Sequence, residues 1–253
     1  MEPLKNKLWI WGHPTNSLKN AFGLKGDSAV SPAEGMAELG ATGIIYVPMG
    51  QKCDRRACNA EMSPAARTGW SIESEEDVDD LIAQKKSFPS LTLGIFDDFF
   101  SEANAERNFT RYSPEKMLAM REKLHAAGLE MWVVFYTMQI GLSVWQEYLR
   151  IFDGVTLWLW DEPTNGEFDE KCRWFFSQTP NQKRMLGCYL YNFGKECPAT
   201  TGSVRYQLDR GLEYLKDGSL SGLILHTNAV GGMGFSAYDE AARWSKGHGD
   251  LLL

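Results

Sequence analysis

The sequence predicts an α/β protein, a (β/α)8 TIM barrel that forms a single domain over residues 1–253. Eight short apolar runs alternate with eight segments that carry helix signals. The apolar runs are nearly continuous, as expected of parallel strands that are covered on both faces. A length of 253 residues is typical of such a barrel. An open doubly wound sheet is the alternative, but the sequence lacks the G-x-G-x-x-G and Walker-type loops that such sheets carry.

The first two units follow from local signals. Residues 8–12 form an apolar run that Gly12 closes, which predicts a strand, and a long loop to about Val30 follows. A helix starts at residues 31–34, where Ser, Pro and Glu occupy the N-cap, first and third positions of a capping box. The β-branched run 43–48 is the second strand and ends at a proline. We expect a short helix near residues 62–67.

The third and fourth units are defined by acidic residues. Residues 68–72 predict a short strand directly before an acidic cap, and the helix that this cap opens runs to about Lys86. The stretch 91–100 begins as an apolar strand and continues into two adjacent carboxylates, Asp97 and Asp98. A Ser-Pro start then predicts a helix over residues 113–128.

The second half of the chain repeats the alternation of strand and helix. We expect the remaining strands at residues 131–137, 155–160, 185–191 and 223–227, and their helices at 143–152, 168–177, 203–216 and 237–246. The glycine-rich segment 231–234 follows the last strand, where a barrel can bind a phosphate, although a flexible turn explains it equally.

Composition limits the classes of ligand. The formal net charge of -7 argues against nucleic acid or an anionic membrane as a partner, because those surfaces require clustered Lys and Arg. Aromatic residues make up 12% of the chain and include nine Trp. Such rings fill cores, and they also stack on sugar faces. A neutral, sugar-like ligand therefore fits better than a polyanion.

Cysteine content and the N-terminal segment say less about function. Five cysteines do not form a disulfide framework, although Cys53 and Cys58 lie close enough in one loop to pair. Their C-x4-C spacing does not predict a metal site, and nothing in the sequence calls for a cofactor. The N-terminal segment lacks a secretory signal, which predicts a cytoplasmic protein, or an exported one whose signal has been removed.

Function in a parallel barrel resides at the carboxyl ends of the strands. Acids, aromatic rings, imidazoles and amides gather at the predicted ends, which is the composition of a carbohydrate site. The candidate substrate-binding residues are Trp11, His13, Trp70, Tyr136, Trp160, Asp161, Tyr191, Asn192, His226 and Asn228. The candidate catalytic residues are Asp97, Asp98 and Glu162. Asp161 and Glu162 can equally cap the helix that follows them.

The Asp97–Asp98 pair carries the chemical hypothesis. Neighbouring side chains of a strand point to opposite faces, so one Asp could face away and cap the chain, unless the backbone turns at the strand end. Two close carboxyls in a cleft cannot both ionise cheaply, so one keeps its proton near neutral pH. An acid beside an anion is what glycosidic cleavage requires.

The run from Gly94 to Asp98 resembles the fourth-strand tip of barrel glycoside hydrolases of the chitinase, hexosaminidase and O-GlcNAcase kind. That resemblance implies that Asp97 orients the substrate acetamido group and that Asp98 is the general acid. Residues that resemble the supporting tyrosine, tryptophan and amide residues of such families are Tyr136, Trp160, Asp161, Tyr191 and Asn192. The alternating acids ending in Glu of the chitinase pattern are absent. Over more of its length, including residues 97–100, 132–137 and 186–189, the chain is similar to a group of uncharacterised bacterial barrel proteins, a likeness that implies the same fold.

Three functional hypotheses follow. The first is a glycoside hydrolase in which Asp98 is the general acid and Asp97 its partner. The second is a metal-dependent sugar isomerase, epimerase or aldolase that uses Asp97, Asp98, Glu162 and His226 as ligands. The third is a barrel without catalytic activity that binds a glycan through Trp11, Trp70 and Trp160.

Overall fold

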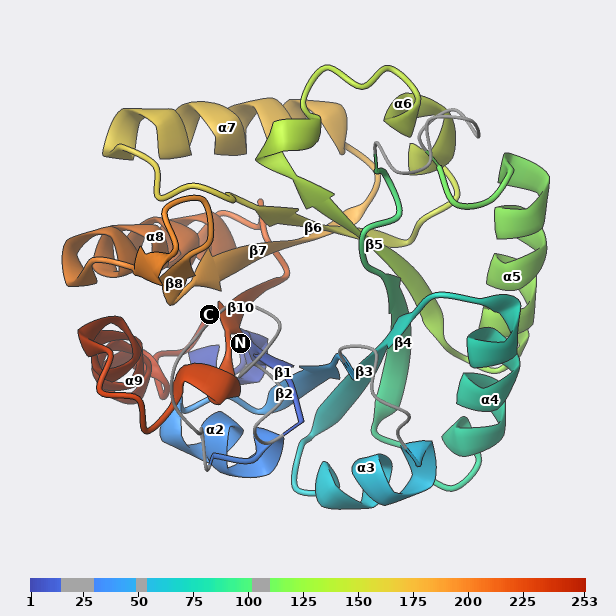
Figure 1. The fold of residues 1–253 in the computed structure, drawn as a ribbon, viewed down its shortest axis with the longest axis horizontal. Helices are drawn as coiled ribbons and strands as arrows, with labels where there is room; N and C mark the ends of the chain where they lie inside the picture. The colour runs from blue at the N-terminus through green and yellow to red at the C-terminus, as the bar shows by residue number, and fades with distance from the viewer. Residues whose placement is uncertain (15–29, 49–53, 102–109) are drawn as a thin grey trace.

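A computed structural model describes residues 1–14, 30–48, 54–101 and 110–253. Eight parallel strands form a closed barrel in the order β1-β10-β7-β6-β5-β4-β3-β2. Figure 1 shows these strands around the centre of the molecule and the helices in a ring outside them. The predicted (β/α)8 TIM barrel is confirmed. The open-sheet alternative is wrong, because β1 is hydrogen-bonded to β2 on one side and to β10 on the other.

The elements alternate along the chain as the sequence predicts. The barrel strands are β1 (Leu8–Gly12), β2 (Gly43–Tyr46), β3 (Arg67–Ile72), β4 (Leu91–Phe96), β5 (Glu130–Tyr136), β6 (Gly154–Trp158), β7 (Lys183–Tyr189) and β10 (Gly222–His226). The α-helices are α2 (Pro32–Glu38), α3 (Arg55–Glu61), α4 (Glu75–Lys85), α5 (Pro114–Ala126), α6 (Trp145–Leu149), α7 (Asn165–Gln178), α8 (Thr201–Lys216) and α9 (Ser236–His248). The smaller elements are the 3-10 helices η1 (Leu4–Lys7), η3 (Thr137–Gln139) and η4 (Asn228–Val230), and the short antiparallel pair β8 (Tyr191–Asn192) and β9 (Cys197–Pro198).

Helix starts are where the sequence places them when a capping residue is present. Ser31 and Ser74 each form a capping box, and Ser113 caps α5. The helix expected near residues 62–67 is wrong: α3 lies earlier because Asp54 accepts the backbone N–H groups of Arg56 and Ala57.

Strand ends were harder to place. The sixth and seventh strands were expected to run to residues 160 and 191, yet β6 and β7 each end two residues earlier. The chain beyond β7 pairs as β8 with β9 and leaves the barrel sheet. The true carboxyl ends are therefore Trp158 and Tyr189, which changes the membership of the site.

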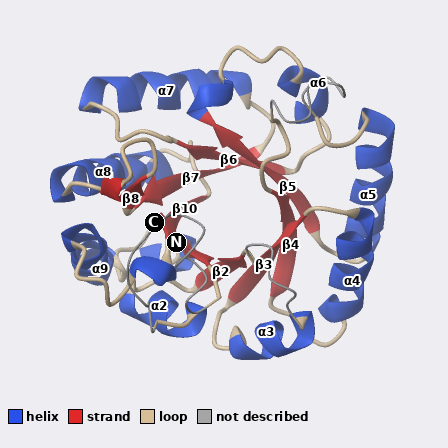
Figure 2. Ribbon diagram, in the orientation of Figure 1, coloured by secondary structure: helices blue, strands red, loops and turns tan. Residues whose placement is uncertain are grey.

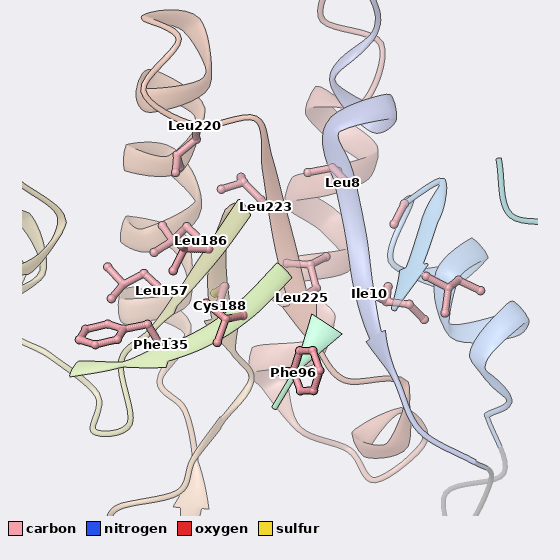
Figure 3. Close-up of a cluster of buried hydrophobic side chains, with 14 of the residues drawn as sticks. Leu8, Ile10, Phe96, Phe135, Leu157, Leu186, Cys188, Leu220, Leu223 and Leu225 are labelled. Atoms are coloured by element: carbon pink, nitrogen blue, oxygen red, sulfur yellow. The ribbon is translucent and has the colours of Figure 1, made fainter. Parts of the chain in front are cut away.

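Apolar side chains form two separate cores. The larger one lies between the strands and the surrounding helices, and Figure 3 shows part of it, with Leu8, Leu157 and Leu225 on their strands and Leu220 just before β10. The smaller core fills the barrel interior and is rich in aromatic rings. Figure 2 shows helices around the outside of the strands. With the smaller core inside the barrel, both faces of the sheet are covered.

Tryptophan and glycine are matched across the barrel wall. Trp9 lies in register with Gly43, Trp132 with Gly154, and Trp158 with Gly187 on the neighbouring strand. A Cβ atom at any of these three glycines would lie within 2.5 Å of the tryptophan ring. The glycines thus provide the space that lets three indoles fill the barrel interior.

Two remaining expectations concern other parts of the chain. Cys53, the predicted partner of Cys58, lies outside the described residues. No helix in the described part of the chain is long and apolar enough to cross a membrane.

Candidate active site

A cavity of about 160 Å³ opens at the carboxyl ends of the strands. Its walls combine aromatic rings with two carboxyls and two imidazoles. The lining residues are Trp11, His13, Asp97, Asp98, Tyr136, Trp158, Trp160, Tyr189, Phe193 and His226. Side chains alternate along a strand, so an inward-facing residue is followed by another two positions later. Ile95 faces the barrel interior, and Asp97 therefore projects into the cavity above it.

Asp97 is held by two hydrogen bonds to the same carboxyl oxygen. The Tyr136 hydroxyl donates to Asp97 Oδ1 at 2.8 Å, and the Asp98 backbone N–H donates to it at 2.9 Å. Tyr136 is the last residue of β5, the strand beside β4. The carboxyl is therefore oriented by the next residue along the chain and by a residue of the neighbouring strand.

Asp98 also lines the cavity, because the backbone turns at this residue. Its φ is 49°, in the left-handed region that Asp tolerates better than most residues. The Arg111 guanidinium donates to the Asp97 carbonyl oxygen at 3.0 Å, and so holds the turn from the outside. Neither member of the pair is directed away from the site. Asp98 is the more exposed of the two.

The pKa of Asp97 is raised to about 7, first by burial and then by the adjacent charge of Asp98, while the hydrogen bond from Tyr136 opposes these changes. Burial also raises the pKa of Asp98, while the nearby charge of Arg111 opposes this change. Because the two groups titrate together, the proton belongs to the pair. Near neutral pH the cavity holds one carboxylic acid beside one carboxylate.

Two histidines form another part of the wall. Asn228 fixes His13: its Oδ1 accepts the His13 N–H at 2.8 Å, and its Nδ2 donates to the His13 carbonyl oxygen at 3.0 Å. The His13 and His226 rings lie edge to face with centroids 5.4 Å apart. Burial lowers the pKa of His13 to about 4 and that of His226 well below its usual range. Both imidazoles are therefore neutral at physiological pH.

Aromatic rings complete the cavity. Trp11 meets Trp158 edge to face at 5.2 Å, and Trp160 lies 5.5 Å from Phe193 at a shallow angle. Three of the lining residues, Trp158, Tyr189 and Phe193, were not predicted from the sequence. Two of them carry a signal. Trp158 is matched with Gly187 on the neighbouring strand. Tyr189 follows Gly187 by two residues and therefore lies on the same inner face.

Some predicted site residues lie elsewhere. Trp70 does not line the cavity: its ring is buried between the barrel and α3, where its indole N–H donates to Asn59 Oδ1 at 2.8 Å. Tyr191 is buried against Phe235, with the two rings stacked at 6.1 Å. Trp70 is at an outward position of β3, where side chains pack against the helices. Tyr191 is in β8, which has left the barrel sheet.

The polar residues after β6 and β7 also lie outside the cavity lining. Asp161 is exposed and packs against Gly194. Glu162 accepts hydrogen bonds from the backbone N–H and the hydroxyl of Thr200, the N-cap residue of α8. Asn192 is buried and accepts the backbone N–H of Lys195 at 3.0 Å. Asn228 supports the site through His13 without being part of the cavity lining.

The ligand set of the metal-dependent hypothesis is not brought together. Asp97, Asp98 and His226 line the cavity, but Glu162 is bonded to the start of α8. Within residues 1–14, 30–48, 54–101 and 110–253, no group of three or more His, Cys, Asp or Glu side chains could hold a metal ion.

The fold and the cavity place the chain in a broad class, the TIM barrels with an acid and aromatic site at the carboxyl ends of their strands. No family model matches the sequence. A comparison with curated proteins finds no significant match.

Solved structures resemble the chain over nearly its whole length. A GH18 chitinase from Pseudoalteromonas aurantia has a TM-score of 0.58 and 8% identity, covering 95% of this chain and 99% of the chitinase. A putative alpha-L-fucosidase from Bacteroides thetaiotaomicron has a TM-score of 0.62 and 8% identity, covering 97% of both chains. A 3-hexulose-6-phosphate synthase has a TM-score of 0.52 and 10% identity, covering 94% of this chain and 98% of the synthase. The resemblance to glycoside hydrolase barrels is confirmed at the level of the fold.

Proposed function

We propose that the protein is a glycoside hydrolase that cleaves a glycosidic bond in a carbohydrate or glycoconjugate. The observation that carries this proposal is the placement of two adjacent carboxyls, Asp97 and Asp98, in one aromatic cavity at the functional end of the barrel. Because the pair retains one proton near neutral pH, it offers an acid and an anion at the same point.

The two carboxyls take different roles because their surroundings differ. Asp98 is the more exposed and is the general acid: in the form of the pair that reacts, the shared proton is on Asp98, and it passes to the glycosidic oxygen as the bond from that oxygen to the sugar carbon breaks. Two hydrogen bonds support the anionic form of Asp97, which stabilises the positive charge that develops on the sugar. Asp98 then removes a proton from the water that completes hydrolysis.

The rest of the cavity suits a sugar. Trp11, Trp160 and Phe193 offer ring faces and edges to the apolar side of a pyranose. Of the described residues, Asp97 and Asp98 are the only acids that line the cavity. A conventional pair of carboxyls on opposite sides of the bond would need a further acid, so Asp97 or a group of the substrate itself must meet the developing charge.

The test replaces each acid and measures turnover of aryl glycosides, among them glucosides, galactosides, fucosides, glucuronides and N-acetylglucosaminides. We expect Asp98→Asn to lower kcat by about 10²–10⁴ for the best substrate, as for loss of a general acid, and Asp97→Asn to lower it at least as much. Glu122→Gln, an exposed acid on α5, is the matched control and should leave kcat unchanged.

Activity that survives both Asp substitutions would overturn the proposal. Binding of a glycan by the wild type without turnover of any substrate would instead favour the barrel that only binds.

A further inference from the structure

Two buried nitrogen atoms in the cavity wall have no hydrogen-bond partner among the described residues. They are Nε2 of His13 and Nδ1 of His226. The two side chains are nearly inaccessible, at 1% and 6% exposure, and both line the cavity. A buried polar atom without a partner is costly, so such atoms indicate a missing ligand group or water.

The chemistry of the His13 nitrogen follows from its other contact. His13 Nδ1 lies 3.1 Å from the carbonyl oxygen of Val47. A carbonyl oxygen only accepts, so Nδ1 carries the proton of the neutral ring and Nε2 is left as a bare acceptor. The missing partner of His13 is therefore a donor. The His226 ring lies edge to face with the His13 ring, with centroids 5.4 Å apart, so one ligand group can contact both rings.

Neutral imidazoles select for a hydroxyl over a charged group. Both rings remain uncharged at physiological pH, since burial lowers their pKa values. A hydroxyl can donate to His13 Nε2 and accept from a protonated His226 Nδ1 at the same time. A carboxylate has no hydrogen to donate to His13, and it would also share the cavity with the Asp97–Asp98 pair.

The geometry of the barrel indicates which hydroxyl is bound. β4, which ends at the acid pair, and β10, which ends at His226, are four strands apart in both directions around the ring of eight. His226 therefore lies across the cavity from the acids, and His13, which follows the adjacent strand β1, lies beside His226. In a pyranose the carbon opposite the anomeric carbon is C4. A cavity of about 160 Å³ matches one six-membered ring, because an engineered cavity of about 150 Å³ in another protein holds benzene.

We propose that His13 and His226 form a recognition site for the free C4 hydroxyl of a terminal, uncharged sugar, which makes the enzyme exo-acting. The inference rests on the proposed function, because the acid pair at the anomeric carbon sets the orientation of the sugar. A substituent on the C4 oxygen removes the hydrogen that His13 Nε2 needs and has no room in the cavity. The two histidines are thus determinants of specificity and take no part in bond cleavage.

The test measures binding instead of turnover. Methyl glycosides of glucose, galactose, fucose, N-acetylglucosamine and glucuronic acid are titrated into the wild type and the Asp98→Asn variant by calorimetry. The best neutral ligand is then compared with its 4-deoxy and 4-O-methyl analogues. We expect each analogue to bind the wild type about tenfold or more weakly, and the glucuronide to bind more weakly than the glucoside.

The variant His13→Asn separates recognition from structure. The Asn amide can still donate to the Val47 carbonyl oxygen but lacks an atom at the position of Nε2. It should bind the parent sugar about tenfold more weakly and the 4-deoxy analogue as the wild type does. His125→Gln, at the opposite end of the barrel beside Asp153, should change neither affinity.

Several outcomes would overturn the inference. The wild type could bind the parent and 4-deoxy sugars equally well, or it could bind the glucuronide more tightly than the glucoside. It could also bind no neutral glycoside at millimolar concentration. If His13→Asn lost affinity equally for the parent and the 4-deoxy sugar, His13 would have a structural role or bind a fixed water instead of a sugar hydroxyl. If turnover does not depend on the acids while the sugars bind in the expected order, the proposed hydrolysis fails and the histidine recognition site stands.

Discussion

The hydroxyl of Tyr136 donates a 2.8 Å hydrogen bond to the carboxyl of Asp97, joining the ends of two neighbouring strands inside the cavity. This contact lowers the pKa of Asp97 against burial, which raises it to about 7. The tyrosine therefore tunes the pH at which the acid pair loses the proton it holds.

Replacing Tyr136 with Phe should move the pH dependence of hydrolysis. Without the donated hydrogen bond the carboxylate form is less stable, so the pKa of the pair rises, by about 0.7 unit if the bond contributes about 1 kcal/mol. The alkaline limb of the kcat profile, expected near pH 7 in the wild type, should shift upward in the variant. Tyr206→Phe, on α8, is the control. An unchanged or lowered limb would contradict this role of Tyr136.

The buried acid should cost the protein stability at neutral and alkaline pH. Asp97 has a pKa raised from 3.8 to about 7, so the folded state holds its proton more tightly than the unfolded chain. The stability that this proton supplies is complete below about pH 4 and is lost as the pH rises to about 7. The Asp97→Asn side chain is neutral at every pH, so the variant should not lose this stability as the pH rises.

Urea unfolding at a series of pH values measures whether stability is lost as Asp97 loses its proton. The variant should gain free energy of unfolding relative to the wild type between pH 4 and pH 7 and hold that gain above, with an upper bound of about 4 kcal/mol. Glu122→Gln should follow the wild type throughout. A constant difference between Asp97→Asn and the wild type would show that Asp97 does not titrate in this range.

A single methyl group added at a glycine that faces a tryptophan should destabilise the protein. A Cβ at Gly187 would lie 2.1 Å from the Trp158 ring, so Gly187→Ala should destabilise the protein by about 1–3 kcal/mol. It should also displace a ring that lines the cavity. Gly202→Ala on α8 meets no atom within 4 Å and should be neutral or slightly stabilising. Thermal unfolding of both variants gives the comparison, and an unaffected Gly187→Ala would refute the packing argument.

The alternation of strand residues explains which site predictions held. His13, Asp97 and His226 are the next inward positions after Trp11, Ile95 and Ile224, and each lines the cavity. The prediction was weaker where strands were extended too far. Because β6 and β7 end at Trp158 and Tyr189, the residues expected as tips lie two positions beyond the true ones.

Other residues could be placed only by long-range contacts. Trp70 has the composition of a sugar platform, but it faces α3 and binds Asn59. Glu162 is acidic and follows a strand, yet it is bonded to Thr200, which is 38 residues away along the chain. Neither partner is visible in the local sequence, because the contact depends on how the helices pack around the barrel.

The sequence by itself determined the architecture, since local apolar runs, caps and turns are sufficient to specify eight strand and helix units, and closure of the barrel brings their carboxyl ends together. It also determined that Asp97 and Asp98 stand at one of those ends. Only the tertiary structure decided that both acids face the cavity, because that depends on the left-handed backbone of Asp98 and on Arg111 across the loop. The unpartnered nitrogens of His13 and His226 likewise follow from burial, which is a property of the assembled barrel.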